Sequence, residues 1–457
     1  MKNIGNQVTR REFMRGAAGA AAITIVPRYV LGGAGVKAPS ERMQIAVVGA
    51  GGMGYANIKA CEAEKFVAFA DVDDERAADT YKQYPDTPRY KDFRKMFDKE
   101  QKNIEAVIVA TPDHTHYAAA MTAVQLDKHL YCQKPLCHSI YEVRKLTEAA
   151  KAAGIQHQMG NQGHSDDTIR MLCEWIADGA IGPVHEVHTW SDRPVGGDPW
   201  SDFPIMARPK EEPLVPATMD WDLWLGPAKW RPYHREYCPQ RWRGWFDFGT
   251  GALGDMGCHI LDPAFWALKL GQPTSVEATT THYEPVVMNE TYPRASIVRY
   301  EFPSRGDMPA VKLVWYDGRL KPAVPECFER GRKLGGNGAL LIGDKGVIMH
   351  DSHGAAGLRI VPETKMKEYK QPAATIPRVK NGSAGHERDW VRACKEGKAA
   401  SANFEYGGPL TEMVLLGVIA MRVKDTRLEW DGANMRFTNS DQANRFIKPE
   451  YRDGWTL

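Results

Sequence analysis

The clearest pattern of apolar and polar positions lies between residues 41 and 162, where short apolar runs alternate with segments of helical periodicity. Such alternation is typical of a parallel sheet whose two faces are covered by helices. The predicted strands span residues 43–48, 66–70, 106–110, 129–132 and 156–160. The predicted helices span residues 55–64, 75–83, 93–97, 117–124 and 139–153, and Ser139 is predicted to cap the last of them. Ligands of such sheets bind at the carboxyl ends of the strands, so residues that follow a strand are the first candidates for a site.

After residue 162 the pattern becomes that of a mainly antiparallel sheet with one covered face. Further strands are predicted at residues 184–190, 275–281, 296–302, 311–316, 339–342, 347–350 and 358–361. Further helices are predicted at residues 166–178, 254–268, 384–395 and 410–423. Residues 191–249 form a long irregular stretch that is dense in proline and tryptophan. A loop of that length inside a compact domain is usually functional.

The first predicted strand runs into Gly49-Ala50-Gly51-Gly52-Met53-Gly54, a G-x-G-x-x-G turn that leads into a helix. In a dinucleotide site the first glycine makes the turn, the second admits the pyrophosphate and the third lets the helix pack closely. The next strand ends at Asp71, roughly 20 residues further on, where an acid can bind a ribose. The pattern therefore predicts an NAD site rather than a turn without a ligand. A carboxylate would repel a 2′-phosphate, whereas the nearby Arg76 leaves NADP open.

Composition and charge narrow the class of protein. A chain of 457 residues is long enough for two or more domains. Its net charge of +2 gives no reason to expect nucleic acid or an anionic membrane as a partner. The eight cysteines are scattered without a CxxC pair, so the sequence suggests neither a zinc knuckle nor a thioredoxin-like site. We expect no metal and no stable membrane insertion.

The N-terminus has the composition of a targeting segment. Residues 9–15, Thr-Arg-Arg-Glu-Phe-Met-Arg, precede a weakly apolar run over 16–26 that is too short to span a bilayer. The paired arginines resemble a twin-arginine export signal, and the alternative is a frayed basic N-terminus. We expect residues 1–40 to be a signal and linker and the protein to be exported, into the periplasm.

Several motifs together resemble the Gfo/Idh/MocA oxidoreductases. They are the glycine turn, Ala70-Asp71-Val72-Asp73, Thr111-Pro112, Tyr131-Cys132-Gln133-Lys134-Pro135 and Asp255-x3-His259. The resemblance implies a Rossmann NAD-binding domain over residues 41–162 and a C-terminal α/β domain over 163–457 for substrate binding and oligomerisation. In that arrangement the helices within 384–424 pack back on the first domain, and the protein is a homodimer or homotetramer. Gln133 departs from the family pattern, which usually has Glu there, and this favours a less basic Lys134.

The chemistry of alcohol oxidation assigns roles to three of these residues. Asp255 and His259 are four positions apart and share one face of a helix. His259 can take the hydroxyl proton, while Asp255 can orient it or bond a sugar hydroxyl. Lys134 can hold the reacting oxygen or act as the base itself. On spacing alone, Asp255 and His259 could equally form an ion pair on a helix surface, and the family resemblance favours catalysis.

The remaining candidate residues follow from their positions in the predicted fold. The residues predicted to bind the cofactor are Gly49, Gly51, Gly52, Met53, Gly54, Asp71, Thr111, Pro112, His116, Lys134 and Asn161. Those predicted to contact substrate are His164, Arg193, Trp242 and Trp245. Packing within the loop is the alternative for the two tryptophans. His114 and His116 could form an HxH metal pair, but no third ligand follows at a suitable spacing. We therefore expect both to be loop histidines whose ring nitrogens are hydrogen-bonded within the protein.

We therefore predict an NAD-dependent oxidoreductase that transfers hydride between a secondary hydroxyl of a sugar, glycoside or cyclitol and a tightly bound cofactor. One alternative is an NAD-dependent glycosidase that oxidises the sugar transiently, eliminates the aglycone, adds water and reduces again. A second alternative is a sugar-binding protein on the same fold that performs no chemistry. The presence of Lys134 favours net oxidation.

Overall fold

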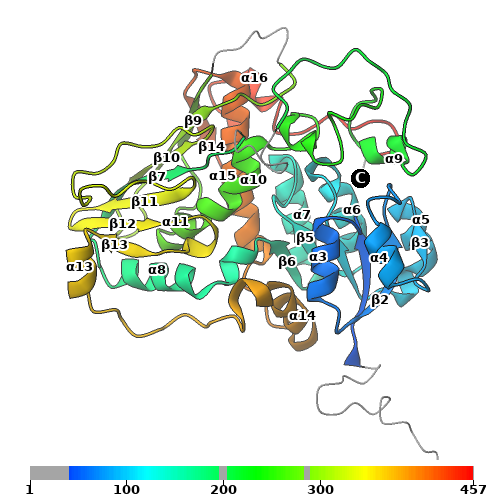
Figure 1. The fold of residues 1–457 in the computed structure, drawn as a ribbon, viewed down its shortest axis with the longest axis horizontal. Coiled ribbons are helices and arrows are strands. Elements are labelled where there is room, and N and C mark those ends of the chain that lie inside the picture. The colour runs from blue at the N-terminus through cyan, green and yellow to red at the C-terminus, as the bar shows by residue number, and fades with distance from the viewer. Residues whose placement is uncertain (1–40, 195–202, 282–288, 456–457) are drawn as a thin grey trace, which may run out of the picture. The chain divides into compact units, whose positions relative to one another are not determined.

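The computed structural model describes residues 41–194, 203–281 and 289–455 (Figure 1). The chain divides into the units Met1–Met43 and Gln44–Leu457, and the second contains both sheets. The segment predicted to be an export signal lies outside the described residues. No helix in the described ranges is both long and apolar enough to cross a membrane.

The first sheet is parallel throughout, as the alternation of apolar runs predicts. In the described ranges its strand order is β3-β2-β1-β4-β5-β6. The strands are β1 (Gln44–Val48), β2 (Lys65–Ala70), β3 (Arg89–Tyr90), β4 (Ala106–Val109), β5 (His129–Gln133) and β6 (His157–Gly160). Strand order reverses between β1 and β4, and a ligand crevice is expected there at the carboxyl ends.

The helices of this half are α3 (Met53–Ala60), α4 (Ala78–Gln83), α5 (Phe93–Glu100), α6 (Asp113–Gln125) and α7 (Ile140–Ala153). α7 begins with the cap predicted from Ser139, because the Ser139 hydroxyl and the Glu142 carboxylate accept each other's backbone N–H. α6 begins at Asp113, earlier than the predicted 117. An acid in the first turn favours that start through the helix dipole.

The second sheet is antiparallel except where β7 pairs with β10. Over the described residues its order is β13-β12-β11-β7-β10-β9-β8-β14-β15. The strands are β7 (Val184–Trp190), β8 (Ser275–Thr280), β9 (Ser296–Phe302), β10 (Val311–Tyr316), β11 (Gly338–Gly343), β12 (Gly346–His350), β13 (Arg359–Val361), β14 (Leu428–Asp431) and β15 (Arg436–Phe437). The predicted fold class is confirmed, although the short strands β3, β14 and β15 were not predicted.

The second half of the chain also contains helices. They are α8 (Asp167–Ala177), α9 (Trp221–Leu225), α10 (Gly251–Ile260), α11 (Asp262–Ala267), α13 (Glu363–Glu368), α14 (His386–Glu396), α15 (Phe404–Val423) and α16 (Asp441–Asn444). α15 runs between the sheets and contacts α7 and β6 on one side and α10 and β8 on the other (Figure 1). This packing holds α10 at the carboxyl edge of the first sheet.

The single helix predicted over residues 254–268 is wrong, because the structure has two helices there. α10 ends at Ile260 and α11 begins at Asp262, with Leu261 between them. Pro263 has no N–H to donate to the carbonyl of His259, so one continuous helix would lose that hydrogen bond. The break sets the orientation of the chain just after His259.

Candidate active site

At two positions of the turn between β1 and α3, the backbone accommodates only glycine. Gly49 has φ of +85°, and a Cβ on Gly54 would lie 1.8 Å from the carbonyl oxygen of Gly49. α3 therefore begins directly beside the end of β1. The N-terminus of α3 and the positive end of its dipole can meet a phosphate there.

Asp71 follows β2 and closes the same turn from the other side. Its Oδ2 accepts hydrogen bonds from the amides of Ala50 (2.8 Å) and Gly51 (3.1 Å), and its Oδ1 accepts one from Asp73 (3.0 Å). Burial raises the pKa of this carboxyl above its ordinary value, and the three amide bonds only partly oppose that shift. The carboxylate thus lies beside the glycine turn, where a ribose-binding acid is expected.

Part of the long irregular stretch covers this end of the site. The chain around Met219 pairs with the chain that follows Asp71, because Asp220 donates to Val72 (2.8 Å) and Thr218 accepts from Asp74 (3.1 Å). We call residues 218–225 the strap. Strap residues line the same cavity as Asp71.

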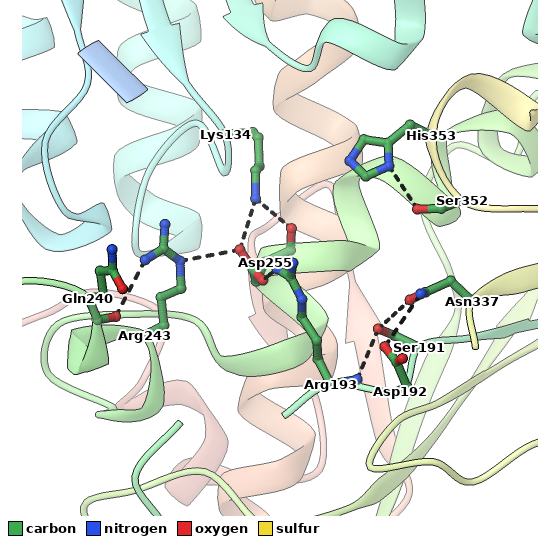
Figure 2. Close-up of polar contacts among 10 residues, drawn as sticks. All are labelled: Lys134, Ser191, Asp192, Arg193, Gln240, Arg243, Asp255, Asn337, Ser352 and His353. Atoms are coloured by element: carbon green, nitrogen blue, oxygen red, sulfur yellow. Dashed lines mark hydrogen bonds and ion pairs between the residues drawn. The ribbon is translucent and has the colours of Figure 1, made fainter. Parts of the chain in front are cut away.

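Lys134 and Asp255 meet at the other end of the site. Lys134 directly follows β5, and its Nζ donates to the backbone carbonyl of Asp255 and to the Oδ1 of Asp255 at 3.2 Å (Figure 2). Asp255 lies on α10 with only 6% of its surface exposed. Lys134 follows a strand of the first sheet and Asp255 lies on a helix of the second half, and α15, which packs against both α7 and α10, brings them together.

Two arginines share the same carboxylate. Arg193 donates through Nη1 to the Oδ2 of Asp255, and Arg243 donates through Nε to the Oδ1 at 3.3 Å (Figure 2). The three cations hold the pKa of Asp255 well below its ordinary range despite its burial. Asp255 is therefore a permanent anion that anchors Lys134, Arg193 and Arg243. In the described residues it makes no hydrogen bond to His259.

His259 lies one turn further along α10 and is 5% exposed. Its Nδ1 is buried and has no hydrogen-bond partner in the described part of the chain. Burial lowers its pKa well below 6.5, and His353 and Lys134 add to the shift. The ring of His353 lies against it, with the ring centroids 3.9 Å apart. His259 is thus a neutral imidazole, which can accept a proton.

A single cavity of about 380 Å³ joins the two ends. The predicted residues that line it are Gly49, Gly51, Gly52, Met53, Asp71, Thr111, Pro112, His116, Lys134, Arg193, Trp242, Asp255 and His259. Gly54 lies beneath the turn and supports it instead. The cavity thus connects the phosphate-binding turn to the cluster around Asp255.

Three residues predicted to contact the cofactor or the substrate do not line the cavity, because their side chains are buried outside it. Asn161 and His164 both bond the carboxylate of Asp262, Asn161 through Nδ2 (3.0 Å) and His164 through Nδ1 (3.0 Å). Trp245 is fully buried, where its Nε1 donates to the carbonyl of Glu236 and its ring packs against Tyr237. None of the three lines the cavity. The buried Asp262 carboxylate needs donors, and it draws Asn161 and His164 to itself.

His114 and His116 lie on α6 rather than on the predicted loop, and backbone carbonyls surround both rings. His114 contacts the carbonyls of Phe248 and Trp224, and His116 those of Pro135 and Thr111 at 2.9 Å each. His116 thereby ties the segment after β4 to the segment after β5. In the described residues no three His, Cys, Asp or Glu side chains are grouped closely enough to hold a metal ion.

Sequence reasoning missed Arg243 and His353, and both line the cavity. Arg243 lies in the Trp-rich stretch, where only the tryptophans suggest a substrate contact. Its Cζ lies 4.3 Å from the centroid of the neighbouring Trp242 ring. No motif or spacing in the sequence indicates His353 as a site residue. It comes from a turn that crosses so close to Gly163 that a Cβ there would lie 2.6 Å from the backbone nitrogen of Gly354.

The residues fit a bound NAD. The glycine turn leaves a cradle that side chains would fill, since a Cβ on Gly51 would lie 2.3 Å from the carbonyl oxygen of Arg76. Asp71 stands beside the cradle for the ribose, and the strap covers that end. Thr111 and Pro112 follow β4 and line the cavity toward Lys134.

Comparisons with known proteins agree with this architecture. Residues 43–161 match the GFO_IDH_MocA model, described as an oxidoreductase family with an NAD-binding Rossmann fold. Residues 195–294 match the model for the C-terminal alpha/beta domain of the same oxidoreductases. The first domain is therefore an NAD-binding Rossmann domain.

Curated relatives and solved structures extend the match. Levoglucosan dehydrogenase of Pseudarthrobacter phenanthrenivorans is 23% identical over 54% of this chain and 55% of its own length. Myo-inositol 2-dehydrogenase of Thermotoga maritima is 27% identical over 33% of this chain and 46% of its own length. The chain thus aligns with about half the length of these relatives.

The solved structure of levoglucosan dehydrogenase in complex with NADH and levoglucosan superposes with a TM-score of 0.56 at 18% identity. The superposition covers 85% of this chain and 99% of that one, and at this identity it shows the shared fold. Models for the Rossmann domain and the C-terminal domain of the Gfo/Idh/MocA oxidoreductases thus both match this chain, one after the other.

Proposed function

We propose that this protein is an NAD-dependent dehydrogenase that oxidises a secondary hydroxyl of a sugar, glycoside or cyclitol. One observation carries the proposal: a single cavity joins the phosphate-binding turn and Asp71 to Lys134, Asp255 and His259. The names of the relatives, levoglucosan dehydrogenase and myo-inositol 2-dehydrogenase, support this class of substrate.

Each side chain has a distinct task in this proposal. The bound nicotinamide supplies the hydride acceptor. The Lys134 ammonium group holds the reacting oxygen and stabilises the negative charge that develops on it. His259 is neutral and buried at the cavity wall, so it can take the hydroxyl proton as a general base. Asp255 keeps Lys134 in place through its Oδ1 and its backbone carbonyl.

The strap supports tight binding of the cofactor. Its backbone pairs with the chain after Asp71, and Met219, Leu223 and Trp224 line the cavity there. A cofactor held beneath the strap would leave only after those hydrogen bonds break. Tight binding suits an exported enzyme, because free NAD is scarce outside the cytoplasm.

The test uses protein loaded with NAD and a panel of glycosides, anhydrosugars and inositols. Reduced-nicotinamide absorbance and release of aglycone are followed together. A lasting rise in absorbance with one class of substrate, lost in Lys134→Met, supports the dehydrogenase. Aglycone release without a lasting rise would instead indicate the redox-neutral glycosidase. Substrate binding without hydride transfer would indicate a sugar-binding protein that performs no chemistry.

We further propose export by the twin-arginine route to the periplasm and assembly as a homodimer or homotetramer. The Arg10-Arg11 pair ahead of a short apolar run supports export, and the family resemblance supports assembly. Replacing both arginines by lysine should retain the protein in the cytoplasmic fraction. Light scattering on the purified protein measures the oligomer size.

A further inference from the structure

We propose that the substrate of this site carries an anionic group, best matched by a carboxylate, that binds beside Lys134 and Arg193. The substrate class is then an acidic sugar or cyclitol derivative rather than a neutral one. This inference rests on the proposed function and specifies its substrate.

The cluster at this end of the cavity contains more positive than negative charge. Lys134, Arg193 and Arg243 surround one carboxylate, that of Asp255, and all four line the cavity (Figure 2). Asp71 and Asp73 line the cavity at the other end, and the remaining acid of the described wall, Asp113, is 4% exposed and accepts from the Thr250 hydroxyl at 2.6 Å. Asp113 also lies in the first turn of α6, where the helix dipole offsets its charge. An excess of cations in a partly buried site favours an anionic ligand.

The hydrogen-bonding capacity of the cluster points the same way. Lysine and arginine only donate, whereas a carboxylate only accepts. The Asp255 carboxylate already accepts from three cations, Lys134 and Arg243 on Oδ1 and Arg193 on Oδ2. The cluster therefore offers mainly donors to a ligand. A neutral sugar hydroxyl also needs an acceptor for its own proton, but a carboxylate does not.

Arg193 is the member best placed to bind the ligand. Within the described residues its Nη1 bonds Asp255, while its Nε and Nη2 have no protein partner. Its side chain is 25% exposed, so these groups can reach the cavity. An arginine fork matches the two oxygens of a carboxylate.

The backbone of Arg193 is held in place beyond the end of β7. Its N–H donates to the Ser191 hydroxyl (3.3 Å), which itself donates to Asn337 (2.8 Å). The neighbouring Asp192 accepts from Asn337 at 3.4 Å, so its carboxylate is directed away from the guanidinium (Figure 2). Arg193 is thus positioned by polar contacts that leave its charge directed toward the cavity.

The test compares matched acids and amides for binding, without turnover. NAD-loaded protein is titrated by calorimetry with D-glucuronate against D-glucuronamide and with D-gluconate against D-gluconamide. Glucose 6-phosphate and glucose 6-sulfate against glucose distinguish a carboxylate from other anions. In at least one pair we expect the charged member to bind about 10- to 100-fold more tightly, as charge-assisted hydrogen bonds allow. We also expect tighter binding with NAD⁺ than with NADH, because the oxidised nicotinamide adds a positive charge.

Variants connect the preference to Arg193. Arg193→Gln should abolish the preference, Arg193→Lys should retain part of it, and Arg299→Gln, on an exposed strand position, should leave it intact. Equal affinity within every pair, or a preference that survives Arg193→Gln, overturns the proposal. The outcome is separable from that of the proposed function. Charge-selective binding without hydride transfer would refute only the dehydrogenase, and turnover of neutral glycosides without charge preference would refute only this inference.

Discussion

Asp71 and Asp255 are two buried carboxylates at opposite ends of one cavity, and their surroundings differ in kind. Among the described residues, the partners of Asp71 are all backbone amides, and burial raises its pKa. Asp255 accepts from three cations, which hold its pKa well below the ordinary range. Similar burial therefore accompanies opposite pKa shifts, and the charge of the hydrogen-bond partners decides the sign.

The difference matches the two tasks of the cavity. The Asp71 end would bind the cofactor through the glycine turn and one acid, which are about 20 residues apart in the sequence. The Asp255 end is assembled from side chains that follow β5, follow β7, lie in the Trp-rich stretch and lie on α10. We expect changes at the first end to alter mainly cofactor binding and changes at the second to alter chemistry.

The largest expected effect is that of Lys134→Met on turnover. Loss of the ammonium group at the reacting oxygen should lower kcat by a factor of about 10² to 10⁴. Affinity for NAD, measured by tryptophan fluorescence, should change much less. Lys151→Met, at an exposed position on α7, is the matched control and should leave both unchanged. A comparable loss of NAD affinity in Lys134→Met would contradict the division of tasks.

Asp255→Asn should lower the free energy of unfolding by about 3 kcal/mol at pH 7.5, since it leaves partly buried cations without their anion. The folded pKa of Asp255 is depressed, so its stabilising effect is present above the unfolded value of about 3.9 and is lost as pH falls through the folded value. Urea unfolding should therefore show the same difference at pH 7.5 and pH 5.5. Asp344→Asn, at an exposed site, should leave the midpoint unchanged.

Asp71→Asn should change the free energy of unfolding by less than about 1 kcal/mol, and this change should have the opposite pH dependence to that of Asp255→Asn. The folded pKa of Asp71 is raised, so its stabilising effect is present below the unfolded value and is lost as pH rises through the folded value. The variant should thus gain stability relative to the native chain between pH 4.5 and pH 7.5. Loss of stability that grows with pH would show that the amide bonds outweigh burial.

The smallest expected effect is the response of turnover to mild acid. The pKa of His259 lies well below 6.5, so the base stays neutral and active as pH falls through that value. Between pH 7.5 and pH 6.5, kcat/KM should change by less than about twofold. A half-maximal rate near pH 6.5 would indicate that the base titrates like an exposed imidazole.

Local pattern was sufficient for the fold class, the parallel sheet and the glycine turn. Strand and helix periods repeat over a few residues, and the turn needs glycine because Gly49 has a positive φ and Gly54 leaves no room for a Cβ. The same reasoning gave Ser139 as a helix cap, since its hydroxyl bonds a backbone N–H three residues away. Helical periodicity alone does not reveal the break at Leu261, because it takes no account of the N–H that Pro263 lacks.

The membership of the catalytic cluster depends on contacts that no local pattern encodes. Lys134, Asp255 and His259 could be named from motifs, but Arg193 and Arg243 reach Asp255 only because the chain after β7 and residues 241–244 both lie against α10. Conversely, Asn161 and His164 lie in a motif that suggests a site, yet the buried Asp262 binds both of them. The sequence determines residue types and short spacings directly. The partners of a buried charge depend instead on which segments the tertiary structure brings within hydrogen-bond distance.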